Sequence, residues 1–193
     1  LKSIQYSVNI VNKTFDIGEL PLAMEEKPIS AHDILMEHVT FSYTGKENVI
    51  HDINLAIPEG AFYALVGPSG GGKSTLARLV ARFWDPTEGA IQIGGVNIKD
   101  IPLTELADQV SFVTQDNFLF NCSILENIRL GNPQATDEQV LEADRKAQCA
   151  EFINKLEQGY QSSAGEAGDR LSGGERQRIA IARAILKNAP IVI

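Results

Sequence analysis

Gly67-Pro68-Ser69-Gly70-Gly71-Gly72-Lys73-Ser74-Thr75 is the stretch of sequence that decides the fold. A short apolar run over residues 61–66 precedes it and predicts a buried strand, and apolar residues at helical spacing follow it over residues 73–83. A strand, a Gly-x-x-x-x-Gly-Lys-Ser loop and a helix in this order are typical of a phosphate-binding loop. Glycines let backbone amides turn towards phosphate oxygens, and the start of a helix offers unpaired N–H groups to an anion. We therefore expect phosphate groups of a nucleotide to bind at Gly67, Ser69, Gly70, Gly71, Gly72, Lys73, Ser74 and Thr75.

Two side chains of this loop indicate the chemistry of the ligand. Lys73 adds a full positive charge that suits the outer phosphates of a nucleotide. Ser74 offers a hydroxyl to Mg²⁺, which prefers a few oxygen ligands beside several waters. The sequence therefore predicts a nucleotide and Mg²⁺ at this loop, and a glycine-rich turn without a ligand is the alternative.

Composition narrows the class of protein. The chain has 193 residues, a hydrophobic content of 44% and a formal net charge of -8, which suit one domain with a sizeable core. The negative charge argues against nucleic acid as a partner. Arg176, Arg178 and Arg183 form a basic run that we expect to be a solvated helix face. No apolar run approaches the roughly 20 residues of a membrane span, and no signal peptide is visible.

The apolar pattern predicts alternating strands and helices. Strands are predicted over residues 34–43, 49–57, 61–66, 90–98 (as a hairpin), 110–115 and 190–193. Helices are predicted over residues 1–20, 73–83, 136–156, which a capping box at Thr136 opens, and 172–188. The stretch that follows residue 20 has prolines and mixed charge, so residues 1–30 are expected to be a linker or connecting helix.

A second glycine motif, Leu171-Ser172-Gly173-Gly174-Glu175, opens the last predicted helix. Ser-x-x-Glu is by itself a capping box, with which any helix can begin. Together with the phosphate loop upstream, the run from Leu171 to Arg178 resembles the signature motif of ATP-binding cassette (ABC) transporters. The resemblance extends over about residues 34–193, and it implies that Ser172, Gly173 and Gly174 contact the γ-phosphate of ATP.

The resemblance also implies a fold. It predicts an α/β chain with a P-loop NTPase core and a parallel sheet, an antiparallel β subdomain near the N-terminus and an inserted α-helical subdomain over about residues 118–170. Residues 31–193 would form this nucleotide-binding domain, and residues 1–30 would connect it to a membrane domain.

Two further positions match the family. Tyr43 is similar to the aromatic residue that stacks on adenine, and a strand tyrosine packed in the sheet is the alternative. Gln115 looks like the glutamine that touches Mg²⁺ and the attacking water. The resemblance thus implies Lys73 and Gln115 as catalytic residues, and Ser74 and Gln115 as metal ligands.

The resemblance implies partners as well. In this family two cassettes form a head-to-tail dimer, with ATP between the phosphate loop of one and the signature helix of the other. A second nucleotide-binding domain and the transmembrane domain of the same transporter are therefore expected, at the cytoplasmic face of the plasma (inner) membrane. Residues 118–120 and 165–168 are similar to exporter-type members, in which exposed Phe118 and Phe120 would suit a socket for the membrane domain; an importer-type cassette is the alternative.

The chain departs from the family pattern after residues 190–193. The family carries an Asp, a Glu and, further on, a His beyond this strand, and none of them is present. We expect the parent polypeptide to hydrolyse ATP and to continue past Ile193. We expect the chain as given to bind nucleotide weakly and not to turn over ATP, because phosphoryl transfer depends on positioned charge.

Two other classes of protein stay open at this point. A soluble ABC-type ATPase of DNA repair or chromosome structure also carries a signature motif, but such proteins usually have a long coiled coil, and no sustained heptad pattern occurs here. A non-catalytic interaction module is the other alternative, and the absent acidic residues favour it for this chain.

Overall fold

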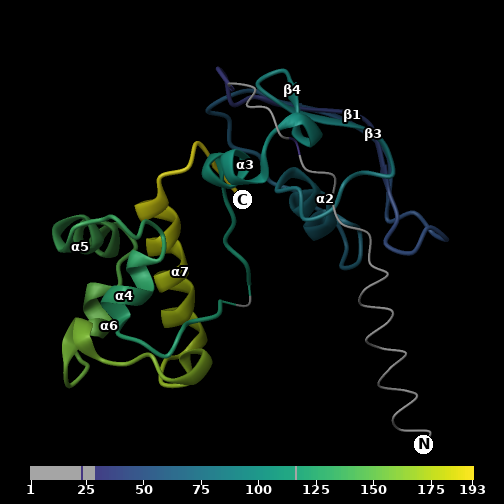
Figure 1. Cartoon of the computed structure of the whole chain (residues 1–193). Helices are drawn as coiled ribbons and strands as arrows, with labels where there is room; N and C mark the ends of the chain where they lie inside the picture. Colours follow the sequence, from purple (N-terminus) through teal and green to yellow (C-terminus); the bar gives the residue numbers. More distant parts are fainter. Residues whose placement is uncertain (1–22, 24–28, 116) are drawn as a thin grey trace, which may run out of the picture. The chain divides into compact units, whose positions relative to one another are not determined.

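The structure is a computed structural model that describes residues 23, 29–115 and 117–193 (Figure 1). The helix predicted over residues 1–20 and most of the linker predicted up to residue 30 lie outside this part of the chain. The chain divides into two compact units between Leu103 and Thr104, and each unit is described by itself.

The first unit is built around a four-stranded antiparallel sheet. Its elements are β1 (Ile34–Phe41), β2 (Ile50–Ile57), α2 (Lys73–Val80), β3 (Glu88–Ile93), β4 (Val96–Asn97) and the 3-10 turn η1 (Ile98–Asp100), and the strand order is β2-β1-β3-β4. Ile34 of the central strand β1 pairs with Ile57 of β2 and with Ile93 of β3. The hairpin predicted over residues 90–98 is confirmed, because β3 and β4 pair antiparallel across a two-glycine turn.

Helix α2 directly follows the glycine loop and ends three residues before its predicted end. Its buried face consists of Thr75, Leu76, Leu79 and Val80. Arg82 has a left-handed φ of 53°, which stops the helix. The Arg82 side chain is buried; it donates to Asp85 at 3.0 Å and to the carbonyl oxygens of Ile98 and Ile101 at 3.0 and 3.2 Å. These bonds fix the end of α2 to the turn η1.

Residues 61–66 do not form the buried strand that the sequence predicts. In the part of the chain that the structure describes, no strand ladder includes them, and Phe62 and Val66 are 96% and 92% exposed. A strand needs a neighbour to satisfy its N–H and C=O groups, and an apolar run alone does not provide one. The prediction is therefore wrong for this segment, whereas β1 and β2 confirm the strands predicted over residues 34–43 and 49–57.

The second unit is mostly helical. From the unit boundary its elements are α3 (Leu103–Gln109), β5 (Val110–Ser111), α4 (Ile124–Arg129), α5 (Asp137–Lys146), α6 (Ala150–Ile153), the 3-10 turns η2 (Gly159–Gln161) and η3 (Glu166–Gly168), α7 (Gly173–Lys187) and β6 (Ile191–Val192). Strands β5 and β6 pair in parallel, which makes the described part of the predicted parallel sheet. Helices α4 and α5 both pack on α7 (Figure 1). None of the helices in residues 29–115 and 117–193 has the length and apolar character that crossing a membrane requires.

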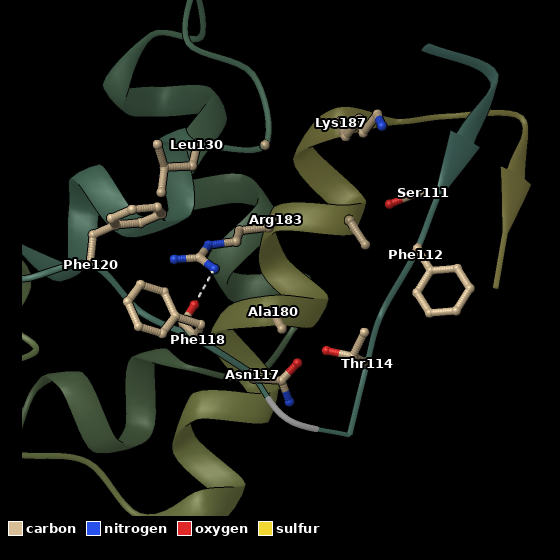
Figure 2. Close-up of a pocket in the computed structure, with 12 residues that line it drawn as sticks. Ser111, Phe112, Thr114, Asn117, Phe118, Phe120, Leu130, Ala180, Arg183 and Lys187 are labelled. Atoms are coloured by element: carbon tan, nitrogen blue, oxygen red, sulfur yellow. Dashed lines mark hydrogen bonds between the residues drawn. The ribbon is translucent and has the colours of Figure 1, made fainter. Parts of the chain in front are cut away.

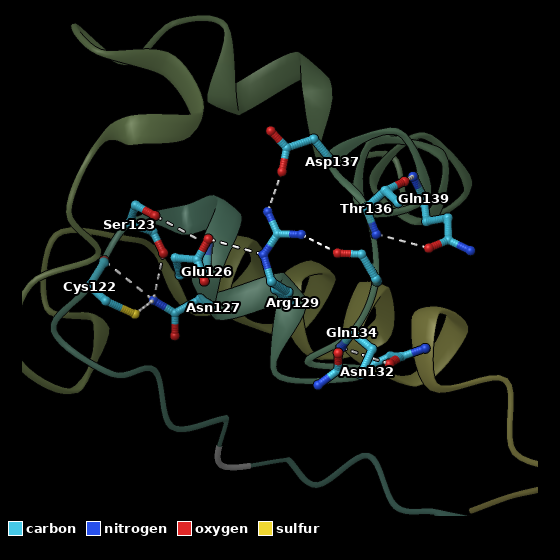
Figure 3. A network of polar contacts seen from close by, with 11 residues as sticks. Cys122, Ser123, Glu126, Asn127, Arg129, Asn132, Gln134, Thr136, Asp137 and Gln139 are labelled. Atoms are coloured by element: carbon cyan, nitrogen blue, oxygen red, sulfur yellow. Dashed lines mark hydrogen bonds and ion pairs between the residues drawn. The ribbon is translucent and has the colours of Figure 1, made fainter.

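A polar network ties α4 to α5 (Figure 3). Arg129, at the end of α4, donates to Glu126 at 3.0 Å and to Asp137 in the first turn of α5. The bond to Asp137, followed by that to Glu126, raises the pKa of Arg129 above its usual value. The capping box predicted at Thr136 is confirmed, since Oγ1 of Thr136 accepts from the N–H of Gln139 and the Gln139 side chain accepts from the N–H of Thr136.

Helix α5 ends at Lys146, whereas the sequence predicts one helix up to Leu156. Gln148 adopts a left-handed φ of 57°, and the N–H of Cys149 donates to the carbonyl oxygen of Asp144 at 3.2 Å. This turn terminates α5 before α6 begins. The apolar spacing continues across the break because both helices face the same core, so periodicity alone does not reveal it.

Asp144 is a charged residue buried inside the second unit. Its side chain is 0% exposed; Oδ2 accepts from the Tyr160 hydroxyl at 2.7 Å, and Oδ1 has no hydrogen-bond partner among the described residues. Burial raises the pKa of Asp144, and the Tyr160 bond opposes that rise. Burial also raises the pKa of the neighbouring Cys149 thiol to about 12, so this thiol stays protonated at neutral pH.

Candidate functional site

The predicted phosphate loop requires glycine at two places. Gly70 and Gly72 have φ angles of 80° and 78°, in the left-handed region that favours glycine. A Cβ atom on Gly72 would lie 2.7 Å from Cδ1 of Ile50 and 3.0 Å from the carbonyl oxygen of Val49, so a side chain there would force Ile50 to move. Gly72 is also the N-cap of α2 and provides no side-chain cap. The first N–H groups of α2 are therefore left for another acceptor.

Lys73 closes the loop on itself. Its Nζ donates to the carbonyl oxygens of Gly67 and Pro68 at 2.9 and 2.7 Å. A cavity of about 210 Å³ lies against the loop, lined by Val49 and residues 69–75. It is smaller than the roughly 300–1,000 Å³ of a pocket for a whole organic ligand, so it suits phosphate groups. The lining residues carry an ammonium group, hydroxyls and backbone N–H groups, which are donors that can attract an anion.

Tyr43 lies beside this loop, as the predicted site requires. Its hydroxyl is 3.0 Å from Oγ1 of Thr75, in the first turn of α2. The side chain is 45% exposed, so Tyr43 is not packed away inside the sheet. The structure thus brings Tyr43 and the phosphate loop together within the first unit.

Helix α7 begins at the second glycine motif with a capping box. Oγ of Ser172 accepts from the N–H of Glu175 at 3.3 Å, and Oε2 of Glu175 accepts from the N–H of Ser172 at 2.7 Å. The N–H groups of Gly173 and Gly174 have no intrahelical partner, because they precede the first helical hydrogen bond. A Cβ atom on Gly173 would come no closer than 3.9 Å to Arg176, and one on Gly174 would meet nothing within 4 Å. Exposed amides and open space therefore surround the start of α7.

Arg176 holds the loop that leads into α7. It donates to the carbonyl oxygen of Leu171 at 2.7 Å and to that of Gly168 at 3.4 Å. Gly168 has a φ of 78°, and a Cβ atom there would lie 2.8 Å from Cδ of Arg176. Arg176 is thus a structural residue of the segment before the signature motif.

A second cavity, of about 420 Å³, lies in the second unit beside α7 (Figure 2). Arg183 donates from Nη1 to the carbonyl oxygen of Phe118 at 2.8 Å and from Nη2 to Oδ1 of Asn127 at 2.6 Å. The rings of Phe118 and Phe120 meet edge to face with centroids 5.2 Å apart, and both side chains are more than half exposed. Burial lowers the pKa of Arg183. The prediction of a solvated face is therefore wrong for Arg183, which joins α7 to the loop that carries Phe118 and Phe120 (the aromatic loop).

The predicted site residues fall into the two units. Tyr43 and residues 67–75 belong to the first unit, and Gln115 and residues 172–174 belong to the second. Gln115 is exposed and follows β5; its carbonyl oxygen accepts from the Asn117 side chain at 3.5 Å. Within the second unit, Gln115 and the signature motif lie on separate segments.

Sequence reasoning missed two residues that support the site. The ring of Trp84 lies 5.1 Å from that of Tyr43, yet its position just after a predicted helix gave no sign of this contact. Asn127 is 0% exposed and bonds both the N–H and the carbonyl oxygen of Phe120 at 2.9 Å. An asparagine among the apolar residues of α4 was the signal that could have indicated this buried role.

Known proteins share these features. A protein-family model described as ABC transporter matches residues 50–193. Two putative multidrug export ATP-binding/permease proteins, from Staphylococcus aureus strains NCTC 8325 and Mu50, are each 45% identical to this chain over 189 residues, which is 95% of this chain and 32% of theirs. The structure of a bacterial Atm1-family ABC exporter with ATP bound is 37% identical, with a TM-score of 0.88 over 97% of this chain and 34% of that chain.

These comparisons test the fold prediction and the choice between functions. The chain spans about a third of the length of the curated relatives it matches. The TM-score of 0.88 at 37% identity confirms the predicted α/β fold with an antiparallel β subdomain and helices. The names of the relatives favour the exporter interpretation over the soluble ATPase of DNA repair.

Proposed function

The chain belongs to the ABC transporter family, and on this premise we propose that it is the ATP-binding domain of a membrane exporter. In the proposed cycle ATP binding closes the domain against a partner cassette, and hydrolysis in the whole transporter releases it. The membrane part then alternates between inward-open and outward-open forms, because each nucleotide state favours one of them. The curated relatives are named for multidrug export, and we extend export, but not the cargo, to this chain.

The geometry of residues 67–75 is the observation that carries the proposal. Gly70 and Gly72 are left-handed, the missing side chain of Gly72 leaves room for the loop, and the cavity beside it is lined by hydrogen-bond donors. Lys73 is proposed to contact the outer phosphates of the nucleotide, where its charge would stabilise the transferred group. The unpaired N–H groups at the start of a helix add further donors to the phosphate groups.

Ser74 and Gln115 are the proposed ligands of Mg²⁺. Ser74 is exposed and lines the loop cavity, and Gln115 is exposed after β5, so each offers a neutral oxygen. Each oxygen by itself is of a kind that Mg²⁺ takes, since the ion uses few protein ligands and completes its shell with water and phosphate oxygens. When bound, the ion neutralises charge on the phosphates. Gln115 is also proposed to orient the attacking water in the complete transporter.

A second nucleotide-binding domain is the proposed partner of the signature motif. Ser172 has an exposed hydroxyl that can donate while its oxygen caps α7, and Gly173 and Gly174 expose backbone amides. These donors suit the γ-phosphate of an ATP held by the phosphate loop of another cassette. One chain alone then supplies half of each ATP site.

The transmembrane domain of the same transporter is the other proposed partner. The 420 Å³ cavity beside α7 exposes the Phe118 and Phe120 rings at its rim, and exposed aromatic rings of this kind suit an apolar partner segment. The fusion of ATP-binding and permease parts in the relatives supports this assignment. We place the domain at the cytoplasmic face of the membrane, where ATP is available.

Equilibrium titration of the chain with Mg-ATP tests the proposal, and Lys73→Ala is the decisive variant. Saturable binding is expected for the original chain and is expected to fall by at least tenfold in the variant, because a charge-assisted contact to phosphate is lost. Lys155→Ala is a matched control, since this lysine is 72% exposed and its ion pair is with Glu151, four residues before it.

Binding that is equal in the original chain, Lys73→Ala and Lys155→Ala would contradict the proposal, provided that all three have the same circular dichroism spectrum. Loss of binding in Lys155→Ala alone would also contradict it, because the ligand would then lie away from the phosphate loop.

A further inference from the structure

Three aromatic side chains form a cluster beside the phosphate loop in the first unit. The ring of Tyr43 lies 4.8 Å from that of Phe41 and 5.1 Å from that of Trp84, centroid to centroid, at interplanar angles of 84° and 88°. Phe41 is 4% exposed and anchors the cluster in the core of the sheet. Edge-to-face contacts at these distances are attractive and directional. The two contacts therefore fix the plane of the Tyr43 ring.

The hydroxyl end of Tyr43 is held as well. It lies 3.0 Å from Oγ1 of Thr75, and Thr75 is 7% exposed in the first turn of α2, so packing of the helix sets the position of that oxygen. Tyr43 itself is 45% exposed. The ring is thus pinned at its hydroxyl, flanked by two other rings and open to solvent elsewhere.

We propose that Thr75 is a positioning residue for the nucleotide base, and that it acts by holding the ring of Tyr43 through the hydroxyl of that tyrosine. This inference rests on the proposed function, because a base must stack on Tyr43. A base that stacks on a fixed ring restricts less side-chain motion than one that must first immobilise the ring. Thr75 follows Lys73 and Ser74 directly, so one hydrogen bond joins the base side of the site to its phosphate side.

The hydroxyl and the ring of Tyr43 are expected to contribute different amounts to ATP binding. A neutral hydrogen bond changes an equilibrium constant by roughly two- to tenfold, and partial exposure places this one near the lower end. Stacking of a base on an aromatic ring is worth roughly five- to a hundredfold. Removal of the hydroxyl alone should therefore weaken ATP binding by about threefold, and removal of the whole ring by more.

A double-mutant cycle in the full chain tests the inference, with Tyr43→Phe, Thr75→Val and the double variant. Calorimetric titrations use Mg-ATP and, as a probe without a base, Mg-tripolyphosphate. Each single variant is expected to bind ATP about threefold more weakly, and the double variant no more weakly than either, because both changes remove one bond. Tyr43→Phe, which leaves the phosphate loop unchanged, is expected to bind tripolyphosphate as the original chain does.

Two further measurements exclude a merely structural role. Thr75→Ser keeps the hydroxyl and is expected to restore ATP affinity, which separates the bond from the packing of the threonine. Trp84 is the only tryptophan of the chain and lies 5.1 Å from Tyr43. Its emission is expected to change when ATP binds and to stay constant with tripolyphosphate.

Three results would overturn the inference while leaving the proposed function intact. They are additive losses in the double variant, an equal loss for ATP and tripolyphosphate in Tyr43→Phe, and failure of Thr75→Ser to restore ATP affinity. Failure of the proposed function looks different, because the original chain would then bind neither ATP nor tripolyphosphate.

Discussion

Helices α2 and α7 both begin at a glycine motif, and the two motifs differ in what surrounds their glycines. Gly72 has a left-handed φ, and a side chain there would collide with Ile50. Gly173 and Gly174 are ordinary helical residues with open space around them. Helix α7 is capped by a serine side chain, whereas α2 begins without a side-chain cap.

This difference separates two reasons for a glycine. In the phosphate loop, the left-handed backbone at Gly70 and Gly72 and the contact with Ile50 at Gly72 make a side chain unfavourable. At the start of α7 the surrounding residues exclude nothing, and alanine would favour the helix by up to about 1 kcal/mol. The glycines of α7 therefore suit the close approach of something outside this unit, as the proposed partner cassette would provide.

Of the substitutions that test this comparison of the two glycine motifs, Gly72→Ala is expected to have the largest effect. The left-handed φ costs alanine about 1–2 kcal/mol, and the contact with Ile50 adds about 1–3 kcal/mol. We expect the free energy of unfolding in urea to fall by the sum of these terms and ATP binding to be lost. Gly70→Ala is the matched control, because Gly70 has φ 80° but no atom within 4 Å of an added Cβ. Equal losses in both variants would show that the steric contact contributes nothing.

The second prediction concerns the buried charged residues of the two units, and its expected effect on stability is smaller. Arg82 in the first unit bonds a carboxylate and two carbonyl oxygens, whereas Oδ1 of Asp144 in the second has no partner in the described chain. Burial raises the pKa of Asp144 in the folded state, so the folded state holds the proton to higher pH than the unfolded chain. Stability from this group is then complete below the unfolded pKa of about 3.9 and is lost as pH rises through the folded pKa.

The measurement for Asp144 is urea unfolding of the original chain and of Asp144→Asn at several pH values above 4. The original chain is expected to lose stability relative to the variant as pH rises, because only the original must bury a carboxylate. Glu151→Gln, at a side chain that is 77% exposed, is the control and should show no such trend. A difference between original and Asp144→Asn that is constant with pH would contradict the raised pKa.

Gly174→Ala is expected to have the smallest effect on folding and sharpens the comparison most. An added Cβ meets nothing within 4 Å, so the free energy of unfolding should stay the same or rise by up to about 1 kcal/mol. Association with a second cassette in the presence of ATP should weaken, as measured by sedimentation with Mg-ATP. A marked loss of stability without any effect on association would reverse the roles that we give to the two glycine motifs.

Local sequence patterns predicted the elements whose causes are local. The hairpin over residues 90–98 and the capping box at Thr136 each depend on a few adjacent residues, and both appear in the structure. The same holds for the signature serine, because Ser172 and Glu175 satisfy each other three residues apart.

Elements that depend on distant partners were not predictable in this way. Residues 61–66 have the composition of a strand but join no ladder, and the left-handed Gln148 ends α5 although the apolar spacing continues. The Tyr43–Thr75 bond joins residues that lie 32 positions apart. Burial of Asp144 against Tyr160 is likewise a result of packing, which charge patterning alone does not indicate.

Helix α7 connects the second glycine motif to the loop that carries Phe118 and Phe120. Its 15 residues span roughly 22 Å from the glycine motif to Lys187. Near its C-terminal end, Arg183 donates a hydrogen bond to the carbonyl oxygen of Phe118, and Lys187 donates to those of Ala107 and Val110. A hydrogen-bonded helix packed along its length resists compression, so the distance between its two ends stays constant. We therefore expect a displacement of Ser172 to be transmitted along α7 to the loop that carries Phe118 and Phe120.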